Sequence, residues 1–119
     1  MNIFGKELEL QKKKVIFRGV TVIVTEIMDE EYHQHVTLPM CEREREEREE
    51  VVEFNREATQ RMLALALVPG LQMSFDDIYT DLRTPGKYPR SFINALLIAM
   101  NEVNGTGVGN SPTTTSDSD

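Results

Sequence analysis

Few side chains in this sequence combine the chemistry and the spacing that an active site needs. His33 and His35 are two residues apart, and on a helix this spacing turns them about 200° from each other, so the pair does not converge on one metal ion. Cys41 precedes a carboxylate-rich stretch, unlike the electropositive surroundings of reactive cysteines. We interpret these residues as two surface histidines and a structural or incidental thiol.

Three aspartates on one predicted short helix are the next candidates. Asp77 and Asp81 share a helix face, with Asp76 beside them, and carboxylate oxygens are the ligands that a hard cation prefers. Helix capping and solvation explain the three residues more simply. The sequence therefore predicts no catalytic residue, no metal ligand and no cofactor, and we expect a protein that is not an enzyme.

Length and charge limit the classes of function. The 119 residues suit one domain, and 20 acidic against 13 basic residues give a net charge of −7. This balance argues against nucleic-acid binding, which needs clustered Lys and Arg. The run Lys12-Lys13-Lys14 is interpreted as a solvated hairpin edge.

Cysteine content and apolar runs bear on the compartment. A single cysteine excludes a disulfide framework and favours a reducing cytosol. The N-terminus lacks the apolar stretch of a signal peptide. The longest apolar run, Met62–Pro69, is far shorter than the roughly 20 residues that span a bilayer. We expect a soluble, intracellular protein without a membrane partner.

The N-terminal part has the pattern of a β-hairpin. Arms near Lys12–Phe17 and Val20–Val24 are rich in β-branched residues and flank Arg18-Gly19, where glycine suits a tight turn. Val20, Val22 and Val24 fall on one face by the two-residue period. An isolated hairpin is marginal in water, so one of its faces is expected to pack on a helix.

Helical patterns follow. Met28–Val36 is predicted as a short helix that Thr37-Leu38-Pro39 breaks or bends, with Thr37 able to cap a new helix. The next helix is predicted from Pro39 to Leu67, with a stop at Pro69-Gly70. The first half of this predicted helix contains Glu42–Glu50, which is polar on every side. The sequence leaves open whether this stretch and Val51–Leu67 form one continuous helix.

Two shorter helices complete the predicted domain. Ser74 resembles a capping residue before Phe75–Leu82. Tyr88-Pro89 opens a final helix whose apolar face runs from Phe92 to Val103, with Gly105 as its stop. The sequence thus predicts a mainly α (α+β) fold at 1–105, with an N-terminal hairpin at about 12–25, a small helical bundle, and a disordered polar tail at 106–119.

One apolar stripe is a candidate binding surface. Its members repeat at intervals of three and four residues along one helix face, and they are Val51, Phe54, Ala58, Met62 and Leu65. Such a stripe is typical of core. If the hairpin covers only part of it, the remainder is a docking groove for a partner helix.

The order of these parts resembles that of a known family. Gly19-Val-Thr-Val-Ile-Val-Thr-Glu-Ile27, running into a short acidic helix, is similar to the N-terminal segment of lambda-like tail assembly chaperones of long-tailed phages. Phe75–Leu82, Tyr88-Pro89 and Phe92–Gly105 are similar to the second half of that pattern. The resemblance covers roughly 15–105, and the charged stretch departs from it.

The resemblance implies a function and partners. Members of this family coat the helical tape measure protein, keep it soluble and help to recruit tail tube protein through a longer, frameshifted form. They act in the host cytoplasm and are absent from the mature virion. The stripe would then mask apolar helices of the tape measure protein, with weak self-association along that rod. No catalytic residues come with this family.

Three other functions remain as alternatives. An acidic regulatory protein-binding module would bind a basic partner with strong salt dependence. A structural head–tail or tail component would be present in purified virions. A small hydrolase would show turnover or bound metal.

Overall fold

The computed structural model describes residues 3–5, 8–46 and 51–105, without the side chains of 43–46 and 51–53. The predicted disordered tail at 106–119 lies outside these residues. The elements, in chain order, are β1 (Lys12–Phe17), β2 (Val20–Thr25), α1 (Asp29–Tyr32), the π-helical turn η1 (His33–Thr37), α2 (Leu38–Glu46), α3 (Val51–Leu71), α4 (Phe75–Leu82) and α5 (Arg90–Val103). The predicted fold class, mainly helical with an N-terminal hairpin, is confirmed.

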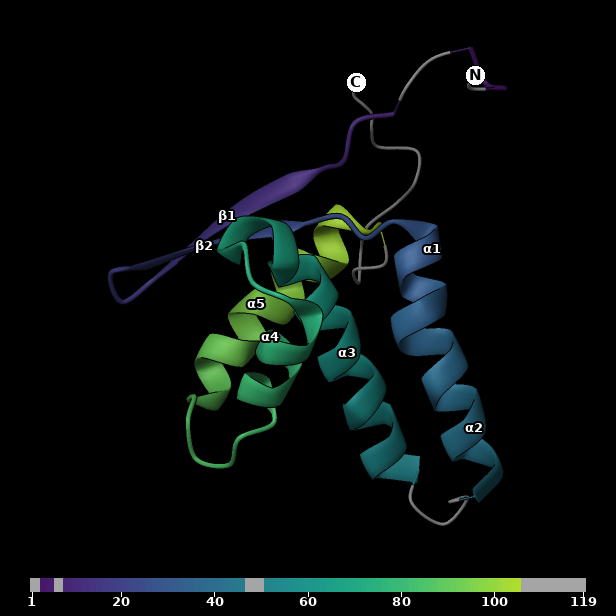
Figure 1. Ribbon diagram of the computed structural model, residues 1–119. Coiled ribbons are helices and arrows are strands. Elements are labelled where there is room, and N and C mark those ends of the chain that lie inside the picture. Colours follow the sequence, from purple (N-terminus) through teal and green to yellow (C-terminus); the bar gives the residue numbers. More distant parts are fainter. Residues whose placement is uncertain (1–2, 6–7, 47–50, 106–119) are drawn as a thin grey trace.

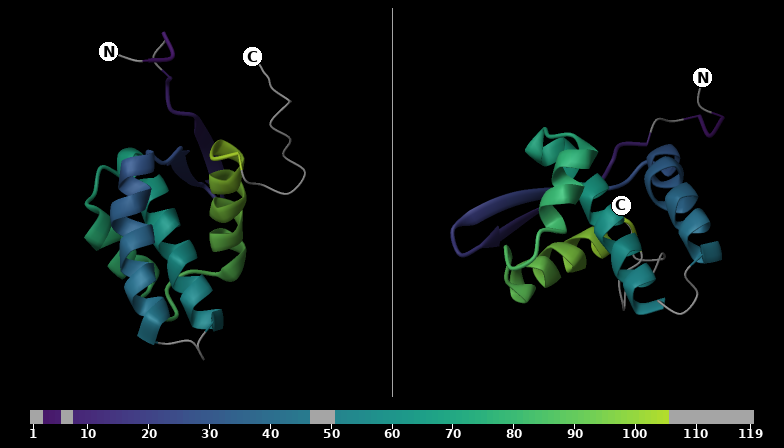
Figure 2. Two further views of the ribbon diagram at one scale, coloured as in Figure 1. Left: turned by 90° about the vertical axis from the view of Figure 1, so that its right-hand side faces the viewer. Right: turned by 60° about the horizontal axis from the view of Figure 1, so that its bottom comes forward.

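Helix α3 is the centre of the arrangement. It lies between a helical arm, formed by α1, η1 and α2, and the pair α4 and α5 (Figures 1 and 2). The hairpin lies across the C-terminal part of α3 and along α5, and its tip extends beyond the helices (Figure 1). Each long face of α3 therefore contacts a different part of the chain.

The hairpin forms as its sequence predicts. Phe17 pairs with Val20 in an antiparallel register, and the two turn residues between them, Arg18 and Gly19, have φ values of 50° and 84°. Two consecutive positive φ angles match the twist of the strands. Val22 and Val24 are buried and face the helices, as the two-residue period predicts.

The main core lies where the hairpin, α3, α4 and α5 meet. Its buried side chains come from all four elements and are Val22, Val24, Leu63, Ala64, Ala66, Leu67, Ile78, Leu96, Ala99, Met100 and Val103. This cluster confirms that the hairpin packs one face on helices. It also confirms the predicted apolar faces of α4 and α5.

Thr37-Leu38-Pro39 was predicted to break or bend the helix, and it does not break it: the arm continues from Asp29 to Glu46, with a π-helical turn at His33–Thr37. The backbone widens just before the proline: the N–H of Leu38 bonds to the carbonyl of His33, five residues back. In a regular α-helix the carbonyl of His35 would accept from residue 39, and Pro39 has no N–H. A π-helical turn accommodates the proline without ending the rod.

The helical region predicted from Pro39 to Leu67, whose continuity the sequence left open, is not one helix. It is divided into α2 and α3, and these two helices lie side by side (Figures 1 and 2). The physical reason lies in the apolar face of α3. A continuous helix would leave this face in water, whereas the arm packed beside it buries Val36 and Met40 against Leu65.

Helix α3 also passes the predicted stop at Pro69-Gly70. It ends at Leu71, and Gln72 then takes a positive φ of 55°. Pro69 costs the last turns one backbone hydrogen bond, which packing against β2 offsets. Gly70 lets the strand approach closely, because a Cβ at this position would lie 2.6 Å from the carbonyl oxygen of Ile23.

The ends of α4 and α5 follow the predicted signals. Ser74 Oγ accepts from the backbone N–H of Asp77 at 3.1 Å, which confirms the N-cap of α4. Helix α5 begins after Pro89 and ends before Gly105, whose φ is 73°.

Candidate protein-binding surfaces

The predicted stripe lies on α3 beneath the arm. Leu65 is buried against Val36 and Met40, while Phe54, Ala58 and Met62 are half-buried in the same cluster. The side chain of the fifth member, Val51, lies outside the described residues. The structure thus brings four of the five predicted residues together, and the cover is the arm rather than the hairpin.

Arg61 fastens the arm to α3. Its guanidinium donates a hydrogen bond to the carbonyl of His35 at 3.1 Å and another to Glu57 at 3.2 Å. The same guanidinium lies 4.7 Å from the ring centroid of Tyr79, and burial raises the pKa of that phenol. The polar contacts of the arm are therefore concentrated around one side chain.

Beside the arm a small hollow leaves part of the stripe open. It has a volume of ≈ 290 Å³ and is lined by Ile27, Asp29, Tyr32, Met62 and Asn104. Met62 is thus shared between the covered cluster and a depression at the surface. Methionine is a flexible, polarisable side chain that suits adaptable contacts.

The residues considered for chemistry do not assemble into a site. His35 packs on Phe75 with ring centroids 4.3 Å apart, His33 is exposed, and Cys41 is an exposed free thiol. Within the described part of the chain, no group of three or more His, Cys, Asp or Glu side chains is arranged to hold a metal ion.

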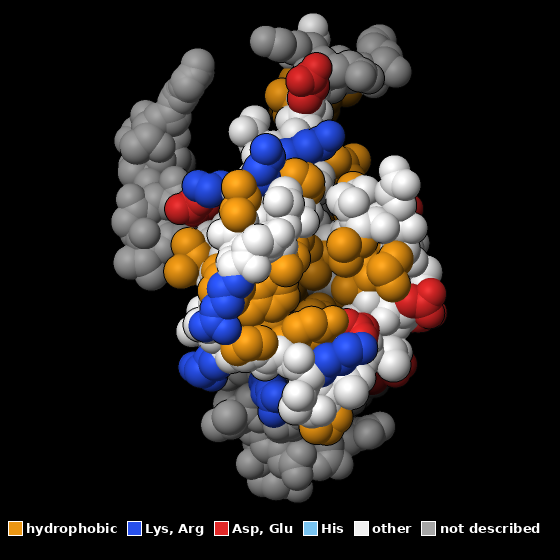
Figure 3. All heavy atoms as spheres, turned by 90° about the vertical axis from the view of Figure 1, so that its left-hand side faces the viewer, with side chains coloured by type: hydrophobic (Ala, Val, Ile, Leu, Met, Phe, Trp, Pro, Cys, Tyr) orange, Lys and Arg blue, Asp and Glu red, His pale blue; other side chains and the backbone are white. Residues whose placement is uncertain are grey.

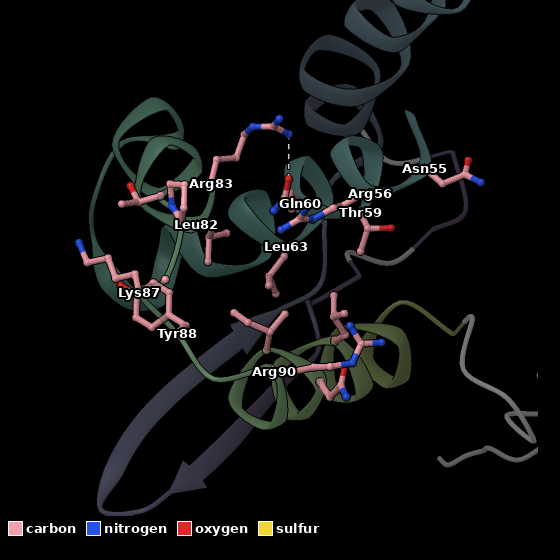
Figure 4. Close-up of a pocket in the computed structure, with 16 residues that line it drawn as sticks. Asn55, Arg56, Thr59, Gln60, Leu63, Leu82, Arg83, Lys87, Tyr88 and Arg90 are labelled. Atoms are coloured by element: carbon pink, nitrogen blue, oxygen red, sulfur yellow. Dashed lines mark hydrogen bonds between the residues drawn. The ribbon is translucent and has the colours of Figure 1, made fainter. Parts of the chain in front are cut away.

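A second surface, which we call the cationic cleft, was not predicted from the sequence. It is a depression of ≈ 670 Å³ between α3, the α4–α5 loop and the start of α5. Its apolar lining includes Leu63, Leu82, Ile93 and Leu97. In Figure 4, Leu63 and Leu82 point into this space, while Lys87 and Tyr88 lie at the opposite end from Asn55 and Thr59.

The charges of the cleft are opposite to that of the chain. Four cationic side chains line it, namely Arg56, Arg83, Lys87 and Arg90, and none of its described lining residues is Asp or Glu. Arg83 is held in place, since it donates to Gln60 at 2.8 Å across the space between α4 and α3 (Figure 4). A local excess of positive charge on an acidic protein attracts anionic groups.

Asp81 fixes the loop at one end of the cleft. It accepts hydrogen bonds from Lys87 and from the hydroxyl of Tyr88. The bond from Lys87 has the largest effect on Asp81, and together with the bond from Tyr88 it holds the pKa of Asp81 below its usual range. The bond to Asp81 is also the main cause that raises the pKa of Tyr88 to about 12, and burial of the phenol adds to it. The sequence was interpreted in terms of helix capping and solvation only, and it did not predict that Asp81 holds the loop.

The tip of the hairpin presents a third feature. Ile16 is 67% exposed and Val20 is 51% exposed, and Phe17 packs on Phe92 with ring centroids 5.2 Å apart. The face toward which the tip points carries hydrophobic side chains at its middle, with Lys and Arg above, to the left and below them, and Asp and Glu to the right (Figure 3).

Comparison of the chain with protein-family models, with curated proteins and with solved structures gives no match. Among the helices described, none is both long enough and apolar enough to cross a membrane. Inferences about function therefore start from the two surfaces on α3.

Proposed function

We propose that this chain is a tail assembly chaperone that coats the apolar helices of a tape measure protein and keeps them soluble. The observation that carries the proposal is the arm on α3. The stripe holds an amphipathic helix in place through Val36 and Met40, so its shape and polarity suit a helix-in-groove contact. A helix of the client would occupy the same place.

The attachment of the arm is modest compared with the main core. Among residues 29–42 of the arm, the buried side chains are Val36 and Met40. Arg61 donates a hydrogen bond to the backbone of the arm at His35. A client that binds only when the arm is displaced has an apparent affinity equal to its intrinsic affinity multiplied by the fraction of molecules in which the arm is displaced. Weak closure of the arm would therefore favour client binding.

Charge and composition support the same function. A net charge of −7 keeps a protein that covers apolar surface in solution. In the proposal the chain acts in the host cytoplasm, leaves before the virion is complete, and recruits tail tube protein through a longer frameshifted form. Copies bound side by side along the client would associate weakly.

Two variants of the covered cluster test the proposal. Phe54→Asp damages the stripe, and Val36→Asp damages only the arm that covers it. Ile98→Asp, at a residue of α5 that is 61% exposed, is the matched control. Each variant is co-expressed with the tape measure protein of the genome that encodes this chain, and the soluble fraction of that protein is measured.

The expected results differ for the two sides of the cluster. Phe54→Asp should abolish solubilisation, whereas Val36→Asp should preserve or increase it, because it frees the stripe. Circular dichroism should show that the helices remain in both. Equal loss in the two variants would identify the stripe as internal core only and would overturn the proposal. A frameshifted reading frame and a very long helical gene downstream would support it.

A further inference from the structure

The cationic cleft is separate from the stripe. Arg56, Gln60 and Leu63 lie on a face of α3 different from that of Phe54, Ala58 and Leu65, since successive residues turn by about 100°. The arm covers the stripe, and the cleft opens toward the α4–α5 loop (Figure 4). Helix α3 therefore presents two separate surfaces.

The composition of the cleft indicates the chemistry of a ligand. Its apolar lining includes Leu63 and Leu82, and its cations come from α3, the α4–α5 loop and α5. A ligand that fits must bury apolar groups and carry negative charge on either side of them. We propose that the cationic cleft binds an acidic, amphipathic peptide segment of a partner protein.

Part of the cleft is organised before binding. Arg83 is held by Gln60 at 2.8 Å and by the hydroxyl of Tyr79 at 3.3 Å. Lys87 is held by Asp81, which neutralises part of its charge. Arg56 and Arg90 are exposed at the cleft. Guanidinium groups bind carboxylates in a bidentate geometry, which gives specificity as well as energy.

Nucleic acid is the alternative anionic ligand, and the observations favour the peptide. Nucleic-acid binding depends on many phosphate contacts, whereas four cations line this cleft and one of them is paired with Asp81. The net charge of −7 repels a long polyanion more strongly than a short acidic peptide, which carries fewer negative charges. The leucine and isoleucine side chains that line the cleft match a peptide better than a phosphate backbone.

The experiment uses three fluorescent probes and the full chain. One peptide of about five helical turns carries Leu on one face and Glu on the other, the second replaces every Glu by Lys, and the third probe is an oligothymidylate strand. Fluorescence anisotropy gives the dissociation constants at low and at high salt. The acidic peptide should bind, and more weakly as the salt concentration rises.

Charge-reversal variants locate the contact. Arg56→Glu or Arg90→Glu should weaken binding of the acidic peptide by about tenfold or more. Lys14→Glu, which makes the same change of charge on β1, is the matched control and should leave binding nearly unchanged. If Arg90→Glu fails to fold by circular dichroism, Arg56→Gln and Arg90→Gln replace the reversals and should each weaken binding.

Four results would overturn the inference. These are absence of binding by the acidic peptide, equal binding by the Lys peptide, tighter binding by oligothymidylate, and equal weakening by Lys14→Glu. Phe54→Asp should leave peptide binding intact, because Phe54 lies under the arm. Failure of the tape measure experiment and failure of this one are therefore distinguishable.

Discussion

Arg61 Nη1 donates a hydrogen bond to the carbonyl oxygen of His35 at 3.1 Å. In a regular α-helix the backbone N–H of residue 39 would donate to this carbonyl, but Pro39 has no N–H. A side chain of α3 thus donates to a backbone carbonyl of the arm at its π-helical turn. The same guanidinium bonds to Glu57 and lies over Tyr79. The irregular turn and the polar part of the arm's attachment therefore meet at one residue of α3.

The first prediction concerns this bond. Arg61→Met should lower the free energy of unfolding by about 1–3 kcal/mol, because it leaves a part-buried carbonyl without its donor. The loss should be smaller when Pro39→Ala is also present, since an alanine in place of the proline brings a backbone N–H of its own. Denaturant unfolding of the four proteins of this double-mutant cycle measures the coupling.

Hydrogen exchange provides the control for the first prediction. In Arg61→Met the amides of the arm should exchange faster, while those of α5 should lose no more protection than the measured fall in the free energy of unfolding accounts for. Arg56→Met, an exposed residue on the same helix, should change neither. An Arg61→Met cost that is the same with and without Pro39→Ala would contradict the explanation.

Local signals in the sequence predicted much of the fold. The turn at Arg18-Gly19 and the Ser74 cap depend on residues that are close together in the chain, so pattern and turn chemistry were sufficient to locate them. The arm depends on a contact between His35 and Arg61, which are far apart in sequence. No local pattern around Pro39 indicates that distant donor.

The candidate sites were predicted unequally for the same reason. The stripe is visible as a helical period, but that period does not reveal whether the cover is the hairpin, the arm or a partner. The cationic cleft has no sequence motif, because Arg56, Arg83 and Arg90 meet only when α3, the loop and α5 pack. A run of charge, such as Lys12-Lys13-Lys14, was easier to notice and lies elsewhere.

A second prediction concerns the close approach of α3 and β2. Gly70→Ala should destabilise the protein by about 1–3 kcal/mol, because the new Cβ meets the backbone carbonyl of Ile23. Helix propensity alone would favour alanine by about 1 kcal/mol, so the two effects have opposite signs. Thermal unfolding decides between them, and a raised melting temperature would show that the strand moves aside at little cost.

A third prediction concerns a buried hydroxyl. Thr25 is 1% exposed, and its Oγ1 has no hydrogen-bond partner among the described residues. Thr25→Val should stabilise the protein by about 1 kcal/mol, since it replaces an unsatisfied polar atom by a methyl group of similar size. Thr21→Val, at an exposed position of the same strand face, is the control and should change stability by less than about 0.5 kcal/mol.

The last prediction concerns the pH dependence of the loop beside the cleft. The hydrogen bond to Asp81 and burial raise the pKa of Tyr88 to about 12, above the usual value near 10. The neutral phenol is the form that donates, so this contribution to stability is fully present below about pH 10 and is lost as the pH rises through about 12. The pKa of Asp81 is lowered by Lys87 and Tyr88. Its contribution to stability is therefore fully present at pH values above its ordinary pKa and is lost as the pH falls below that value.

Absorbance titration of Asp81→Asn should show one tyrosine ionising at lower pH than in the unchanged chain, and Asp76→Asn should not. Identical titration curves for the two variants would mean that Tyr88 does not donate to Asp81 in solution.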